Sequence, residues 1–162
     1  MNKIARFFCI ITTFLLGIVS GKFVEWVKEE KRMDKMEMKF NRMNAFYNLS
    51  MQWLALEQEQ QNLSEYFKFN DYHTVAIYGM GDFGERLVAE LQGTEIKVCY
   101  IVDQNADNIE TRLPKYKPMD DLPHADVIVV TAIMSFQDIQ EMMEKRVDIP
   151  IISLEDVVYG LA

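Results

Sequence analysis

Three glycines at G-x-G-x-x-G spacing have the clearest chemical meaning in this sequence. Gly79, Gly81 and Gly84 follow a short apolar run, residues 75–78, and precede a segment with helical periodicity. In order, such glycines allow a tight turn, let the backbone approach a pyrophosphate, and let the helix pack closely on the strand. Free N–H groups and the dipole at the helix start add an anion site. We therefore predict nucleotide phosphate binding by six consecutive residues, Gly79, Met80, Gly81, Asp82, Phe83 and Gly84.

An acidic residue after the next apolar run fits the same interpretation. Residues 96–102 form that run and Asp103 follows it, 19 positions after Gly84. In dinucleotide-binding units a carboxylate near this position accepts hydrogen bonds from the adenosine ribose. No Lys or Arg stands among the five residues after Asp103, so a 2′-phosphate would meet no positive charge. The predicted cofactor is therefore NAD or a related nucleotide, in preference to NADP.

Other parts of the predicted site also admit a purely structural interpretation. Thr131 and Ala132 end a strand-like run, and they either line the ligand crevice or simply finish the strand with small residues. Asp82 stands where the phosphate should lie, and its carboxylate is able to cap the helix itself, worth about 1 kcal/mol. Such a cap would place a built-in anion in the site. Arg86, one turn later, either offsets this charge or is an ordinary exposed arginine.

The elements that must position these residues alternate between strand and helix. Strand-like runs occupy residues 75–78, 96–102, 115–116, 125–132 and 149–153. The expected helices run from Asp82 until Gly93 stops the helix, over one turn from Met119 to Leu122, from a Ser135 cap to about Arg146, and from about Glu155. This alternation predicts an α/β fold with a small doubly wound parallel sheet, Rossmann-like, of about five strands.

The N-terminus carries an uncharged apolar run, residues 7–19. Extended from Ile4 to Gly21, it nearly spans a bilayer at about 1.5 Å per residue. A cleaved signal peptide is the alternative, with Lys3 and Arg6 as its charged start. We favour an uncleaved anchor, because secretion would separate a nucleotide-binding fold from its nucleotide. Basic residues are denser after the run than before it, which predicts a single-pass cell-membrane protein whose C-terminal domain is cytoplasmic.

A long helix is expected after the anchor, since residues 22–61 contain neither proline nor glycine. Its apolar residues form two stripes. The first has coiled-coil spacing, broken at Glu29 and Ser50, and comprises Trp26, Met33, Met36, Phe40, Met43, Tyr47 and Leu54. The second comprises Phe46, Leu49, Trp53, Leu56 and Leu63. Two stripes need two surfaces, for instance a second copy of the chain and the chain's own globular domain; a solvated stalk beside membrane lipid is the alternative for the first. The predicted domains are therefore an anchor (1–22), a helical stalk (23–65) and a nucleotide-binding domain (66–162).

Composition and missing motifs exclude several functions. Residues 1–21 and 22–42 each carry a net charge of +2 in a chain of net charge −8, so residues 43–162 carry −12 and nucleic-acid binding is not expected. No tyrosine is followed four positions later by lysine, and there is no Walker lysine or metal-ligand spacing. His73 and His124 flank strands at the edge away from the ligand crevice. We predict no catalytic residue and no metal site. Cys9 and Cys99 are interpreted as small buried apolar residues in a reducing compartment.

About 95 residues of this chain resemble the N-terminal nucleotide-binding unit of membrane-bound nucleotide-sugar dehydratases, and more broadly Rossmann-like domains of bacterial surface-polysaccharide proteins. The resemblance is carried by residues 75–84, 100–103, 126–131 and 151–157. A Gly-x-Gly-Asp-x-Gly loop also occurs in that family, which implies that Asp82 is compatible with nucleotide binding. The catalytic extended domain of those enzymes has no counterpart here, so the resemblance implies nucleotide binding rather than dehydratase activity.

The leading expectation is a non-catalytic accessory or sensor protein in bacterial surface-polysaccharide biosynthesis. It would bind an NAD-type nucleotide in the cytoplasm, and the resemblance implies a glycosyltransferase or polysaccharide-assembly protein as partner. Two alternatives stay open. One is an oxidoreductase or nucleotide-sugar-modifying enzyme that works with a partner, and the other is an interaction scaffold with a vestigial nucleotide site.

Overall fold

The computed structural model describes the backbone of residues 3–161 and the side chains of residues 25–161. The chain forms two compact units, Met1–Phe46 and Tyr47–Ala162. A single helix, α1 (Lys3–Gln58), makes up the first unit and continues into the second. Within the part of the chain whose side chains are described, no helix is both long and apolar enough for a bilayer. The predicted anchor, residues 1–22, lies outside that part.

A five-stranded sheet with only parallel pairs forms the centre of the C-terminal unit. Its strands are β1 (Thr74–Tyr78), β2 (Lys97–Val102), β3 (Lys115–Tyr116), β4 (Val127–Val130) and β5 (Ile151–Ser153). Their spatial order is β3-β2-β1-β4-β5, so the chain starts in the middle, builds one half outward, and returns to build the other. Strand order therefore reverses beside β1. The predicted α/β class, with about five parallel strands and a long N-terminal helix, is confirmed.

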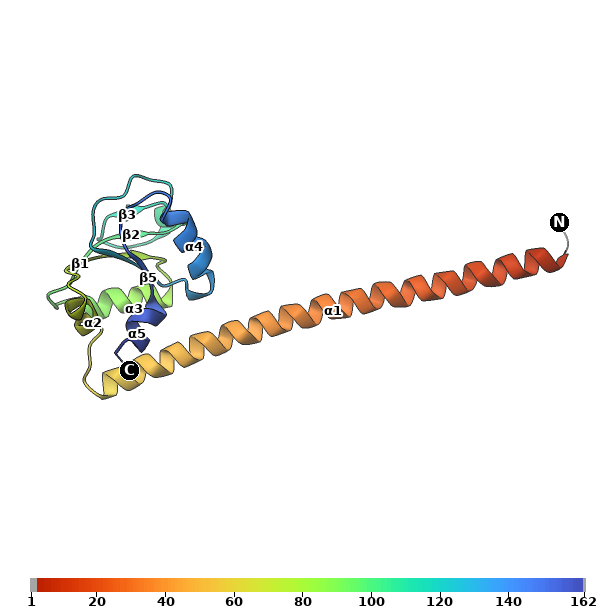
Figure 1. Ribbon diagram of the computed structural model, residues 1–162, viewed down its shortest axis with the longest axis horizontal. Helices are drawn as coiled ribbons and strands as arrows, with labels where there is room; N and C mark the ends of the chain where they lie inside the picture. The colour runs from red at the N-terminus through yellow and green to blue at the C-terminus, as the bar shows by residue number, and fades with distance from the viewer. Residues whose placement is uncertain (1–2, 162) are drawn as a thin grey trace. The chain divides into compact units, whose positions relative to one another are not determined.

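Helices cover the sheet because its strands are apolar on both faces. All four residues of β4 are buried, as are the last four of β1. Alternate residues such as Ala76, Tyr78 and Val130 form one cluster, against which Phe136 and Ile139 of α4 (Phe136–Met143) pack. In Figure 1, α3 (Asp82–Leu91) and α5 (Leu154–Tyr159) both lie away from α4, beside the other face of the sheet. The central strands β1 and β4 are thus shielded from water on both sides, as is typical of parallel sheets.

The last turns of α1 belong to this globular unit. Leu49, Trp53 and Leu56 are at most 2% exposed, and Leu63 is fully buried. These residues are four of the five in the second apolar stripe; the fifth, Phe46, is half-buried and belongs to the first unit. For the four, the globular domain is the surface that buries the stripe. The helix ends where Gln60 adopts a left-handed conformation, φ 60°, and the Gln61 N–H bonds the Leu56 carbonyl at 2.9 Å.

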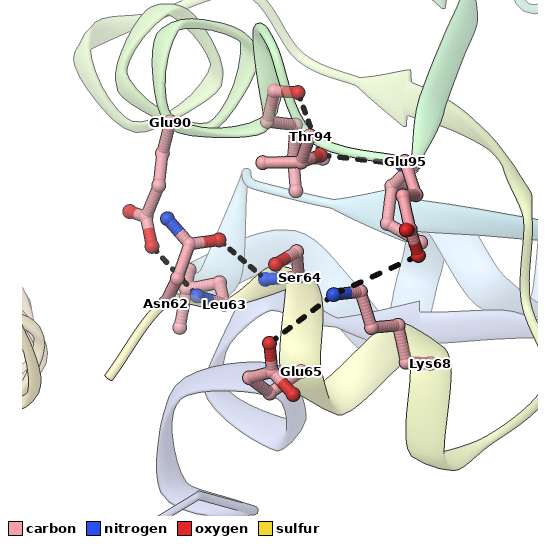
Figure 2. Close-up of polar contacts among 10 residues, drawn as sticks. Asn62, Leu63, Ser64, Glu65, Lys68, Glu90, Thr94 and Glu95 are labelled. Atoms are coloured by element: carbon pink, nitrogen blue, oxygen red, sulfur yellow. Dashed lines mark hydrogen bonds and ion pairs between the residues drawn. The ribbon is translucent and has the colours of Figure 1, made fainter. Parts of the chain in front are cut away.

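A carboxylate on α3 fixes the connection that follows α1. Glu90 accepts hydrogen bonds from the Trp53 indole N–H and, at 2.7 Å, from the Leu63 backbone N–H. Figure 2 shows Glu90 pointing at Leu63 from α3, just before α2 (Ser64–Phe69) begins. Beside it, Lys68 of α2 lies 3.3 Å from Glu65 and 3.8 Å from Glu95. The α1 end and α2 are therefore tied to the helix that starts at the glycine loop.

Three local predictions need correction. Residues 119–122 do not form a helical turn; Asp120 instead accepts the Lys117 N–H at 2.7 Å and closes a turn around Pro118. Ser135 precedes α4 without capping it through its side chain, because it ends a short 3₁₀ helix, η2 (Ile133–Ser135). The helix α4 itself stops at Met143 rather than near Arg146. The short closing helix was predicted correctly and begins at Leu154, where Ser153 and Asp156 form a capping box.

Candidate functional site

Two of the three loop glycines are required by the fold itself. Gly79 has φ +97°, a conformation that favours glycine, and an added Cβ would lie 2.9 Å from the Thr131 hydroxyl oxygen. A Cβ on Gly84 would lie 2.2 Å from the Gly79 carbonyl oxygen, which no packed backbone tolerates. Gly84 is buried at the start of α3, so this contact brings the helix against the end of β1. Both glycines would be needed whether or not a ligand binds.

Gly81 differs from its two neighbours in the motif. Its backbone, φ −84° and ψ −167°, is extended and open to any residue type. A Cβ built on it would have no neighbouring atom within 4 Å. Gly81 is also exposed. Neither strain nor packing within the described chain explains a glycine here, whereas close approach by a ligand would.

The N-terminus of α3 is open to an anion. The first intrahelical hydrogen bond runs from the Glu85 N–H to the Gly81 carbonyl at 3.0 Å, and no side chain caps the helix. Asp82 is exposed, and its carboxylate does not fold back onto the amides of the first turn. Asp82 therefore leaves the amides uncapped, although Asp82 and Glu85 place two carboxylates in the first turn. The dipole and amides of this turn are available to a phosphate.

Asp103 holds the glycine loop in place from the end of β2. One carboxylate oxygen accepts the Met80 N–H at 2.9 Å, and the other accepts the Asn105 N–H at 2.8 Å. A carboxylate has about four acceptor positions, so two remain for ribose hydroxyls. Asp103 is half-buried and lines the neighbouring pocket. Thr131, by contrast, uses its hydroxyl to bond the Gly79 carbonyl at 2.7 Å and is 5% exposed.

A pocket of about 430 Å³ lies where the strand order reverses. Its lining residues come from the ends of β1 and β2 and from the segment around α4: Tyr78, Gly79, Asp103, Gln104, Ala132, Ser135, Asp138, Ile139 and Met142. Ligands of open parallel sheets bind in this position, outside the carboxyl ends of the strands. The volume is within the range of small-molecule sites.

One lining residue carries a buried polar group that the chain satisfies poorly. The Tyr78 side chain is 4% exposed, and its hydroxyl makes no well-formed hydrogen bond in the described part of the chain; the Gln104 side chain beside it is only a weak partner. Burial raises the pKa of Tyr78, so the phenol stays protonated and is a donor at neutral pH. Leaving a buried hydroxyl unpaired costs about 1–3 kcal/mol. A ligand in the pocket is one way to satisfy it.

The structure brings only part of the predicted site to this pocket. Gly79, Asp103 and Ala132 line it, and Gly81 and Asp82 are exposed at the adjacent helix start. Met80 is half-buried with its N–H on Asp103, whereas Phe83, Gly84 and Thr131 are buried within the unit. The Phe83 ring stacks on Trp53 of α1 with centroids 6.2 Å apart.

Sequence reasoning missed most of the pocket lining. The missed residues are Tyr78, Gln104, Ser135, Asp138, Ile139 and Met142. A signal was present for Tyr78, because it shares alternation with Ala76 and so faces α4 at the carboxyl end of β1. The place of Asp138 and Ile139 in the pocket lining could not be predicted, because it depends on where α4 packs and hydrophobic periodicity does not give that position.

The lining suits a sugar or base better than a phosphate. Asp103 and Asp138 place two carboxylates in the pocket, and no lysine or arginine lines it. A phosphate fits instead at the start of α3, beside Gly81. The residues present therefore fit an adenosine in the pocket with its phosphates on the helix. For the residues with described side chains, no group of three His, Cys, Asp or Glu could hold a metal ion.

The histidines lie by the opposite edge of the sheet, as expected. The His73 N–H donates to Asp126 at 2.8 Å, next to the start of β1, and His124 precedes β4.

Family models, curated protein sequences and solved structures give no match to this chain. The function is therefore inferred from its own sequence and geometry.

Proposed function

We propose that the C-terminal unit is a Rossmann-like module that binds an adenine dinucleotide of the NAD type without a catalytic role of its own. Gly81 carries this proposal. Its φ and its surroundings allow any side chain, yet the residue is glycine at the open start of α3. The strand order, with its reversal beside β1, is the order of dinucleotide-binding sheets and supports the same conclusion.

Each part of the ligand has a proposed contact. The pyrophosphate lies against the α3 amides beside Gly81, where a side chain would block it. The ribose hydroxyls donate to the free acceptor positions of Asp103. The base enters the pocket and accepts a hydrogen bond from Tyr78. A 2′-phosphate would approach Asp103 and Asp138 with no lysine or arginine in the lining, so NADP binds less well than NAD.

The cellular setting is proposed from the sequence. The uncharged run 7–19 supports a membrane anchor, with the C-terminal unit in the cytoplasm. The resemblance to nucleotide-sugar dehydratases supports an accessory or sensor role in bacterial surface-polysaccharide assembly, beside a glycosyltransferase or another assembly protein. In this role, nucleotide binding would sense the nucleotide level in the cell, and the partner protein would catalyse the reaction.

Nucleotide-dependent stabilisation tests the proposal. The full chain, purified in a mild detergent, is melted alone and with NAD, NADP or free adenosine. NAD at about 100 times its Kd is expected to stabilise the protein by about 2.7 kcal/mol, NADP less, and the Gly81→Val variant not at all. An equal shift in wild type and Gly81→Val, or no shift with any nucleotide, contradicts the proposal and leaves the scaffold alternative.

A further inference from the structure

The first unit carries a row of large apolar side chains that its own chain leaves in solvent. Met33, Met36, Phe40 and Met43 of α1 are 59%, 57%, 59% and 66% exposed. Their spacing of three, four and three residues places them at alternating d and a positions of heptads, with Phe40 at an a position. Trp26, one heptad before Met33 in the same register, is 59% exposed. We call residues 26–43 at these positions the seam.

The seam contrasts with the other apolar stripe of the same helix. Leu49, Trp53 and Leu56 are buried within the globular unit, whereas nothing in the described chain covers Met36 or Met43. A helix presenting such a stripe gains most of its stability from packing it against another surface. A contiguous exposed apolar row of this kind marks an interaction surface.

We propose that the seam pairs with the same residues of a second copy of this chain, as a parallel, in-register coiled coil. Flanking charges support this partner. Arg32 occupies a g position and Glu37 the e position that faces it from the next heptad of the partner. By symmetry, a parallel dimer forms this attractive pair twice. Within the described chain neither side chain is in an ion pair, so both are available to a partner.

The same charges disfavour the antiparallel arrangement. When the seam is paired head to tail, e faces e and g faces g, which sets Glu30 opposite Glu37 and Arg32 opposite Lys39. Both contacts are repulsive and each occurs twice. The parallel arrangement has two kinds of repulsive contact, both near the start of the seam: Glu25 with Glu30, and Glu29, which stands at the d position between Trp26 and Met33, with Glu29 of the other copy. Around Met36 and Phe40 its charges attract. Charge pattern therefore selects the parallel orientation, which also agrees with two chains entering from one membrane.

Engineered cysteines test the seam with a matched control. Met36 and Met38 are both exposed methionines of α1, 57% and 62%, but only Met36 lies at a d position. In the full chain with Cys9 and Cys99 replaced by serine, Met36→Cys is expected to form a disulfide-linked dimer under mild oxidation. Met38→Cys is expected to form no disulfide-linked dimer, although it still dimerises non-covalently. Equal crosslinking of the two variants, or none with Met36→Cys, overturns the proposal.

A charge exchange tests partner and orientation together. Glu37→Lys sets lysine opposite Arg32 in the parallel dimer and is expected to raise the dimer dissociation constant roughly tenfold. The double variant Arg32→Glu with Glu37→Lys restores attraction and should return it to the wild-type value. In an antiparallel dimer Glu37→Lys would instead face Glu30 and tighten binding, which contradicts the proposal.

Light scattering on the full chain in detergent gives the mass, and circular dichroism confirms that each variant is helical. A wild-type monomer, including one that binds anionic vesicles only as a monomer, also contradicts the proposal. This inference does not rest on nucleotide binding, since the charge exchange leaves the glycine loop untouched.

Discussion

The two edges of the sheet differ in how completely the chain satisfies its own polar groups. At the amino edge, Asp126 accepts the His73 and Thr74 N–H groups at 2.8 and 2.7 Å, and its own N–H bonds the Thr74 hydroxyl at 2.9 Å. At the carboxyl edge, the Tyr78 hydroxyl makes no well-formed hydrogen bond in the described chain and Gly81 borders open space. The polar groups at the amino edge are satisfied by hydrogen bonds within the folded chain. At the carboxyl edge, a hydroxyl group and open space remain for a ligand, so we expect the ligand site there.

The largest expected effect separates the glycine that folding needs from the one it does not. Gly84→Ala forces a Cβ against the Gly79 carbonyl, so we expect it to lower the free energy of unfolding by about 3 kcal/mol or more. Gly81→Ala, in the same loop, is the matched control and should change it by less than about 1 kcal/mol. Urea unfolding followed by circular dichroism measures both. A similar loss in the free energy of unfolding for the two variants would contradict the claim that folding requires Gly84 but not Gly81.

Two tyrosines on the same face of the sheet should respond with opposite signs. Tyr78→Phe removes a buried hydroxyl that makes no well-formed hydrogen bond and is expected to raise the stability of the ligand-free protein by about 1 kcal/mol. Tyr100→Phe removes a hydroxyl that donates to the Pro123 carbonyl at 2.8 Å and should lower it by about 1 kcal/mol.

Ligand binding extends this tyrosine comparison. Tyr78→Phe is expected to weaken NAD binding about fivefold in a calorimetric titration, while Tyr100→Phe leaves it unchanged. Loss of stability in Tyr78→Phe would mean that its hydroxyl already has a partner, and the proposed contact with the base would be wrong.

The smallest effect concerns pH at the amino edge. Hydrogen bonds from Thr74 and the His73 backbone hold the pKa of Asp126 below its ordinary value. A lowered pKa contributes stability that is present above the ordinary value and is lost as pH falls through the lowered one. Wild type should therefore exceed Asp126→Asn in melting temperature at about pH 6, and the gap should narrow below about pH 4. A gap that is constant with pH would contradict the role given to the carboxylate.

Local patterns were enough to predict the strands and the glycine loop. Residues 75–78 and 96–102 alternate or are uniformly apolar, and Gly79, Gly81 and Gly84 mark the turn into α3 by spacing alone. The burial of the Leu49 stripe could also be inferred, because two stripes on one helix need two surfaces.

What the sequence could not supply was contact between distant segments. Glu90 binds Trp53 and Leu63 across 37 and 27 positions, which draws the end of α1 into the globular unit. Asp103 binds the Met80 N–H across 23 positions, so it supports the loop before it meets any ribose. Residue spacing does not predict such hydrogen bonds between residues far apart in the sequence. The same limit hid Asp138 and Ile139, which line the pocket only because of where α4 packs.

A side-chain series at Gly81 tests the central claim most directly. NAD is titrated calorimetrically into the full chain carrying glycine, alanine or valine at this position, with the melting temperature of each ligand-free variant as the control. Because the space beside Gly81 is proposed to hold the pyrophosphate, the dissociation constant should rise from glycine to alanine to valine while the ligand-free melting temperature barely changes. An NAD dissociation constant that is the same for all three residues would contradict the account.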